Sequence, residues 1–152
     1  LITLKSHPFE GGHPDHDATS FAVHAARRLL QRQGEPAPGI AEMAFYHLGP
    51  DGLVLQRFPP GGPPGIVLKL AEADWEVKRR MLACHETQQR TLAPFTDWVE
   101  RFRPAPAYDF TLPPNDGRLH YDAWPWGLRG AEWPGLAAAA LAELELNPPP
   151  WP

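Results

Sequence analysis

Residues 1–32 read LITLKSHPFEGGHPDHDATSFAVHAARRLLQR, and this stretch decides the fold. Its first six residues begin with four that are apolar or β-branched and predict a strand, and a loop rich in His, Gly and Pro follows. From residue 17 to residue 32 the apolar residues recur with the period of a helix, namely at Ala18, Phe21, Ala22, Ala25 and Leu29. A strand that runs through such a loop into a helix is typical of an α/β protein.

The expected ends of this helix follow from its flanking residues. Pro14 suits the first helical position because its φ angle is fixed, and Asp15 or Asp17 can cap the helix start. Gly34 suits the position just after the helix end.

The next segments predict short strands. Residues 41–48 and 53–58 flank Gly49-Pro50-Asp51-Gly52, whose residue types favour a tight turn, so we expect an antiparallel hairpin. After a Pro- and Gly-rich loop, residues 66–70 predict another strand.

The second half of the chain predicts helices separated by an irregular region. We expect a long helix over residues 71–93, irregular structure after Phe95 and a short helix near residues 135–146. Residues 1–146 are then one domain, and residues 147–152 form a Pro-rich tail.

Composition excludes several classes of protein. The 20 prolines and 13 glycines are many, but 43% of the residues are hydrophobic and six are Trp, so the chain can build a core. The net charge is −4 and no block of like charges occurs, so we expect no nucleic-acid partner. The single Cys84 excludes an internal disulfide framework and a Cys-rich zinc site, which leaves oxygen and imidazole ligands for any metal.

The sequence also predicts where the protein resides. The longest strongly apolar run, residues 136–142, is too short to span a bilayer, and the start of the chain lacks a signal-peptide pattern. We therefore expect no membrane association and a cytoplasmic location. Because residue 1 is Leu and already reads as strand, we expect the chain to be part of a longer sequence.

The densest chemistry lies at the start of the first helix. His13 and His16 are one helical turn apart, with Asp15 between them, and can reach a common cavity. One imidazole can bind a metal while the other handles protons. Solvated neighbours of a helix cap would show the same pattern, and the pair supplies too few ligands for a catalytic zinc ion, which takes three from the protein.

Three segments resemble a known family. HPFEGGHPDHDAT (residues 7–19) resembles the second signature motif of the LmbE-like (PIG-L) zinc deacetylases. KRRMLACHETQ (residues 78–88) is similar to a helix of that family, and RFRPAPAYDF (residues 101–110) resembles a stretch near the C-terminus of some bacterial members. These blocks place the resemblance over about residues 1–130.

The resemblance implies a Rossmann-like three-layer α/β sandwich, of which this chain is the C-terminal half with an antiparallel hairpin. It also implies one zinc ion and hydrolysis of an N-acetyl group from an N-acetylglucosamine-type sugar or conjugate. By this resemblance His16 is a zinc ligand and His13 is an electrostatic stabiliser or general acid. Asp15 is the carboxylate that hydrogen-bonds to His13 and orients it.

The chain departs from the family at one point. The first family motif, His-Pro-Asp-Asp, supplies the other two zinc ligands and the general base, but here His7-Pro8 is followed by Phe9-Glu10. The chain thus has one of three expected zinc ligands. Either it is an incomplete part of an amide hydrolase, inactive alone, or it is a non-catalytic sugar-binding or interaction module. We expect a partner, either a missing N-terminal segment or, as an open alternative, further copies of the chain.

Other chemically active residues have simpler interpretations. Structural roles are the stronger expectation for Glu10, His24, His47, Cys84 and His85. Several aromatic residues either stack on sugar rings or cover an edge of the core: Tyr108, Tyr121, Trp124, Trp126 and Trp133.

Overall fold

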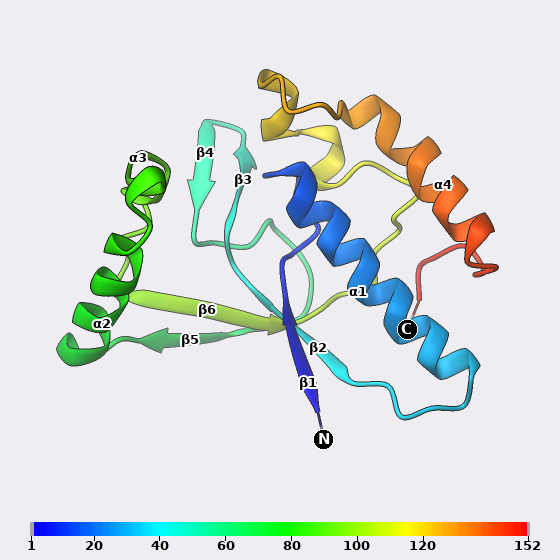
Figure 1. The fold of residues 1–152 in the computed structure, drawn as a ribbon, viewed down its shortest axis with the longest axis horizontal. Coiled ribbons are helices and arrows are strands. Elements are labelled where there is room, and N and C mark those ends of the chain that lie inside the picture. The colour runs from blue at the N-terminus through cyan, green and yellow to red at the C-terminus, as the bar shows by residue number, and fades with distance from the viewer. Residues whose placement is uncertain (1, 152) are drawn as a thin grey trace.

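A four-stranded mixed sheet lies at the centre of the computed structural model, which describes residues 2–151 (Figure 1). Its strands, in spatial order, are β1 (Thr3–Ser6), β2 (Gly39–Met43), β6 (Val99–Pro104) and β5 (Ile66–Lys69). β1 and β2 are parallel and the other two pairs are antiparallel. The helix α1 (Pro14–Arg32) connects β1 to β2, because parallel neighbours need a crossover connection. The predicted α/β class is confirmed at this level.

The predicted hairpin is confirmed, but it stands apart from the sheet. β3 (Tyr46–Gly49) and β4 (Gly52–Leu55) form a separate two-stranded antiparallel sheet. The prediction of one strand over residues 41–48 is therefore wrong. After β2 the backbone N–H of Tyr46 donates to the Glu10 carboxylate, 3.0 Å away, and the chain turns out of the first sheet.

The prediction of one continuous helix over residues 71–93 is wrong. Helix α2 (Glu72–Ala83) and the single-turn helix α3 (Gln89–Leu92) occupy this region. The side-chain amide of Gln89 donates to the backbone carbonyls of Leu82, at 2.9 Å, and His85, at 3.1 Å. These bonds satisfy carbonyl groups at the end of α2, so the chain can turn there.

The region after Phe95 is more regular than predicted, because the central strand β6 lies in it. The predicted last helix exists as α4 (Trp133–Glu143). Short 3-10 turns occur at Glu86–Gln88, Asn115–Gly117, His120–Ala123 and Gly130–Glu132. Across residues 2–151, every helix falls short of the length and apolar character that a membrane crossing requires.

The hydrophobic core lies on one side of the molecule, between α1, α4 and the segments around Phe9 and Phe110. Trp133, Ala137 and Leu141 bring the apolar face of α4 into this core. Figure 1 shows α2 and α3 at the opposite end of the molecule from α4. There, α2 has no buried residue and all four residues of β5 are exposed.

Helix α1 buries a more polar face than its apolar spacing predicts. Ala18 and Ala22 are exposed, whereas the buried positions include Asp17, Ser20 and His24. Pro14 opens the helix as predicted, but the N-cap is His13 rather than an aspartate. The loop before the helix folds back over Asp17, whereas His24 is covered by Tyr108 and Phe110.

His24 provides a test of this polar face. Its ring packs against Tyr108 and Phe110, and its Nε2 atom has no hydrogen-bond partner. Burial, with a smaller effect of the Arg27 charge, lowers the pKa of His24 to about 4. The folded state then binds fewer protons than the unfolded state, so the free energy of unfolding falls as the pH drops from about 6.5 to about 4.

Replacing His24 with Phe should remove this contribution, up to about 3 kcal/mol between those pH values. Urea unfolding of wild type and H24F, measured between pH 7 and pH 4, checks it. The exposed His85 gives the control, because H85Q should follow the wild-type profile. Parallel profiles for H24F and wild type would contradict the burial argument.

Candidate functional site

The loop between β1 and α1 is held by a carboxylate of the helix that follows it. Asp17 Oδ1 accepts the backbone N–H groups of Glu10, at 3.0 Å, and Gly11, at 3.1 Å. Asp17 is fully buried, and burial raises its pKa to about 7 although the two N–H bonds act in the opposite direction. The loop is therefore closed onto the first turn of α1, and His13 sits at a fixed position as the N-cap.

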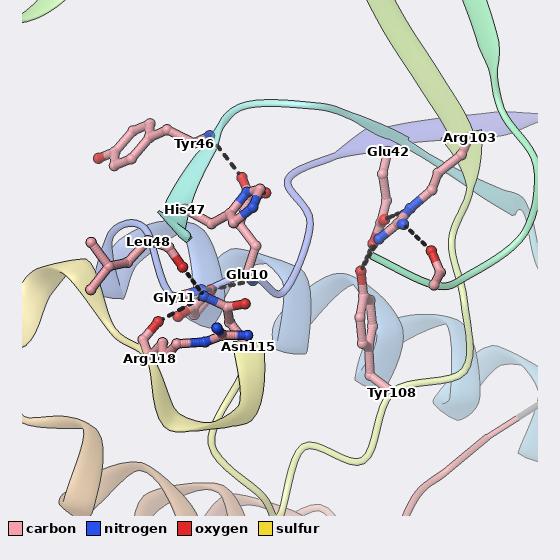
Figure 2. Close-up of polar contacts among 12 residues, drawn as sticks. Glu10, Gly11, Glu42, Tyr46, His47, Leu48, Arg103, Tyr108, Asn115 and Arg118 are labelled. Atoms are coloured by element: carbon pink, nitrogen blue, oxygen red, sulfur yellow. Dashed lines mark hydrogen bonds and ion pairs between the residues drawn. The ribbon is translucent and has the colours of Figure 1, made fainter. Parts of the chain in front are cut away.

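Glu10 ties the same loop to the hairpin (Figure 2). Its Oε1 atom accepts the Tyr46 backbone N–H, and its Oε2 atom lies 3.6 Å from His47 Nδ1. Both side chains are buried, and burial raises the pKa of Glu10 well above its ordinary value and lowers that of His47. The expected structural roles of Glu10 and His47 agree with these contacts.

Three imidazoles gather where the loop meets α1, and we call His7, His13 and His16 the histidine cluster. The His13 and His16 ring centroids are 5.0 Å apart, so the two predicted side chains do lie together. His7 stacks on His16 with a centroid distance of 4.3 Å and an interplanar angle of 4°. Phe45 and Tyr46 pack against His16 in T-shaped geometry.

Burial controls the charge of two rings of this cluster, His7 and His16. Burial, with smaller effects of the His7 and His13 charges, lowers the pKa of His16 to about 3. The pKa of His7 is lowered for the same reasons, with burial as the larger cause and His13 as the smaller. At neutral pH His16 is therefore a neutral imidazole, which is the form that binds a metal ion.

The structure places Asp15 beside His13 without the hydrogen bond that the resemblance implies. Asp15 Oδ2 lies 3.9 Å from His13 Nδ1, and the carboxylate is 87% exposed. His13 Nδ1 instead accepts the backbone N–H of Asp15 at 3.1 Å. This bond fixes the ring and leaves the hydrogen of a neutral His13 on Nε2.

The described residues do not make a complete zinc site. Within residues 2–151, no group of three or more His, Cys, Asp or Glu side chains is placed to hold a metal ion. His7 cannot supply a second ligand beside His16 in this arrangement, because lone pairs of parallel stacked rings lie in separate parallel planes.

Aromatic residues of the segment 120–126 extend the cluster. The Trp126 and His13 ring centroids are 4.6 Å apart, and Trp126 stacks on Trp124 with centroids 5.7 Å apart and an angle of 11°. Of the other predicted sugar-stacking residues, Trp133 and Tyr121 are buried in the core region. Tyr121 and Trp133 therefore belong to the core, whereas Trp124 and Trp126 have exposed rings.

A second polar network lies along β2 and β6 (Figure 2). Arg103 Nε donates to Glu42 Oε2 at 3.0 Å, and the Tyr108 hydroxyl donates to Glu42 Oε1 at 2.6 Å. Arg103 also donates to Tyr108 at 3.2 Å and lies over the Phe58 ring. Because every partner is satisfied within the protein, we assign this network a structural role.

Sequence reasoning missed the contributions of His7 and Trp126 to the cluster. The only sequence signal for His7 is its position in the same Gly- and Pro-containing loop as His13. Trp126 is more than 100 residues away along the chain, and no local pattern predicts that its ring meets His13.

Gly12 tests how closely the loop packs on the hairpin. A Cβ atom at Gly12 would collide with the Tyr46 carbonyl oxygen and approach the Tyr46 ring to 3.0 Å. Gly12→Ala should therefore lower the free energy of unfolding by about 2–3 kcal/mol. Gly135→Ala in α4 is the matched control, since its Cβ would meet nothing within 4 Å. Equal urea midpoints for both variants would show that the loop is not packed as described.

Comparisons with known proteins add no identification. No family model, no curated protein and no solved structure matches this chain. The function is therefore inferred from the residues of the cluster and from the motif in which they lie.

Proposed function

We propose that this chain is the part of a zinc-dependent N-deacetylase that carries the His13-Pro14-Asp15-His16 segment. Its substrate would be an N-acetylated amino sugar or a conjugate of one. The observation that carries the proposal is the convergence of His13 and His16, with ring centroids 5.0 Å apart, at the start of α1. In this proposal His16 is the zinc ligand that the chain contributes, and the remaining ligands come from another segment or chain.

His13 is suited to act on the amide. Its Nδ1 accepts the Asp15 backbone N–H, so its Nε2–H can donate to a carbonyl oxygen as negative charge develops there. When His13 takes up a proton at Nδ1 and so gives up the Asp15 N–H bond, its Nε2 proton can pass to the departing amine and the ring is left neutral. Its side chain is 28% exposed, which leaves a route for substrate. The Asp15 carboxylate lies 3.9 Å from His13 Nδ1.

We further propose that the mixed sheet belongs to a Rossmann-like three-layer sandwich. The parallel β1-α1-β2 unit supports this proposal, since it is the basic unit of such folds. Among the described strands β1 pairs only with β2, and Ile2 and Leu4 at its end of the sheet are exposed. A further strand beside β1 would cover this edge.

A second candidate is a non-catalytic sugar-binding module. The exposed indoles of Trp124 and Trp126 favour it, because they lie beside the cluster and offer apolar ring faces without requiring a metal. The two candidates differ in whether His16 binds zinc and whether an amide bond is cleaved.

Zinc binding tests the role of His16. We expect residues 1–152 to bind zinc weakly by calorimetry and H16A to abolish that binding, because a single imidazole dominates the site. H85A is the control and should titrate as wild type does, since His85 is exposed and lies at the end of α2. Identical curves for wild type and H16A would contradict the assignment.

Acetate release tests the reaction. Residues 1–152 alone should release no acetate from N-acetylglucosamine with zinc present, because their ligand set is incomplete. The coding sequence on either side of these residues should be examined for a His-Pro-Asp-Asp strand end, and the whole reading frame assayed. There H13Q should lower kcat by roughly 100- to 10,000-fold. An active whole protein that tolerates H13Q would exclude the proposed role of His13.

A further inference from the structure

We propose that Trp124 and the hollow that it lines form a subsite that holds a pyranose ring of the substrate, with Trp126 connecting Trp124 to His13. This inference rests on the proposed function, because it names the part of the protein that would select an amino-sugar substrate for that site. The occupant is a sugar ring, either that of the N-acetylated sugar or one joined to it.

The two indoles are exposed although they are large and apolar. Trp124 is 50% exposed and Trp126 is 39% exposed. Exposed apolar surface of this kind beside polar groups is typical of a binding site. Trp126 contacts both His13 and Trp124, so the indole pair lies next to the histidine cluster. A pyranose ring has an apolar face of C–H groups that packs on an indole face.

Trp124 shares a hollow with charged side chains. It lines a hollow of about 790 Å³ together with the charged residues Asp122, Arg129 and Glu132. That volume lies within the range of small-molecule sites. An aromatic face next to carboxylate and guanidinium groups matches a sugar, which has apolar C–H faces and hydroxyl groups around its edge. A purely apolar partner would leave these charges without water.

Hydrogen bonds hold the subsite in position. Trp124 Nε1–H donates to His120 Nε2 at 3.2 Å, and the His120 backbone N–H donates to the Gly11 carbonyl at 2.8 Å. The indole pair is thereby fixed to the same loop that carries His13. Across the hollow, the Gly130 N–H donates to Asp122 Oδ1 at 2.7 Å. A preorganised site loses less entropy when it binds a ligand.

The chain contains a second indole pair, which also lines a hollow of about 790 Å³ but has the carboxylates of Glu72 and Glu76 and no guanidinium in that lining. Trp75 and Trp98 stack with centroids 4.5 Å apart and an angle of 5°, and Trp98 is 46% exposed. This pair joins α2 to the segment before β6, and no imidazole ring contact is found for it among the described residues. It controls for nonspecific contact between sugars and exposed indoles.

The test is a titration of the 152-residue chain with N-acetylglucosamine and its β1,4-linked disaccharide, followed by NMR of the tryptophan Nε1–H signals. We expect sugar to shift the Trp124 and Trp126 signals and to leave those of Trp75 and Trp98 unchanged. W124A should weaken binding about tenfold, as the loss of one ring stack predicts. W124F keeps a ring and should retain most of the affinity, whereas W98A should bind as wild type does.

The outcomes separate this inference from the proposed function. Sugar shifts that need Trp124 support the subsite even if H16A leaves zinc binding unchanged, which would overturn only the deacetylase proposal. Zinc binding that needs His16, with no sugar shift at Trp124 or Trp126 up to 50-fold excess over about 1 mM protein, would overturn the subsite alone. Equal shifts at both indole pairs would also overturn it, because they would indicate nonspecific contact.

Discussion

The arrangement of the site depends on one buried carboxylate. Asp17, in the first turn of α1, accepts the N–H groups of Glu10 and Gly11 and so folds the loop after β1 back onto the helix. Without these bonds two backbone donors would be buried without partners, which costs about 1–3 kcal/mol each. The same closure brings Glu10 to the start of β3 and His13 to the N-cap. One side chain therefore couples the helix, the hairpin and the histidine cluster.

The local elements near this loop were predictable from sequence. Strand β1, the proline that opens α1 and the hairpin around residues 49–52 each follow from residue types in a short window. The helix face was not predictable in the same way, because Asp17, Ser20 and His24 are buried by contacts with distant segments. The strand β6 was missed for a related reason. It is fixed by its neighbours β2 and β5 and by the Glu42–Arg103 ion pair, none of which is visible in a local pattern.

In the candidate site, too, some contacts could be predicted from local sequence and others could not. The closeness of His13 and His16 follows from helical spacing, and the structure confirms it. The stacking of His7 on His16 and the approach of Trp126 to His13 depend on how the loop and the segment 120–126 fold over α1. Such contacts cannot be predicted from sequence spacing, because they arise from tertiary packing rather than from the helical repeat.

The environment gives the two central imidazoles different properties although they lie one turn apart. His16 lies against His7 and Phe45, and burial keeps it neutral with a free lone pair. His13 has a side chain that is 28% exposed, with its Nδ1 held by the backbone and a carboxylate 3.9 Å away. Two like groups in unlike surroundings are a common way to separate catalytic roles. The stacked His7 contributes to this difference, because its ring covers one face of His16 at a centroid distance of 4.3 Å and its charge adds to the lowering of the His16 pKa.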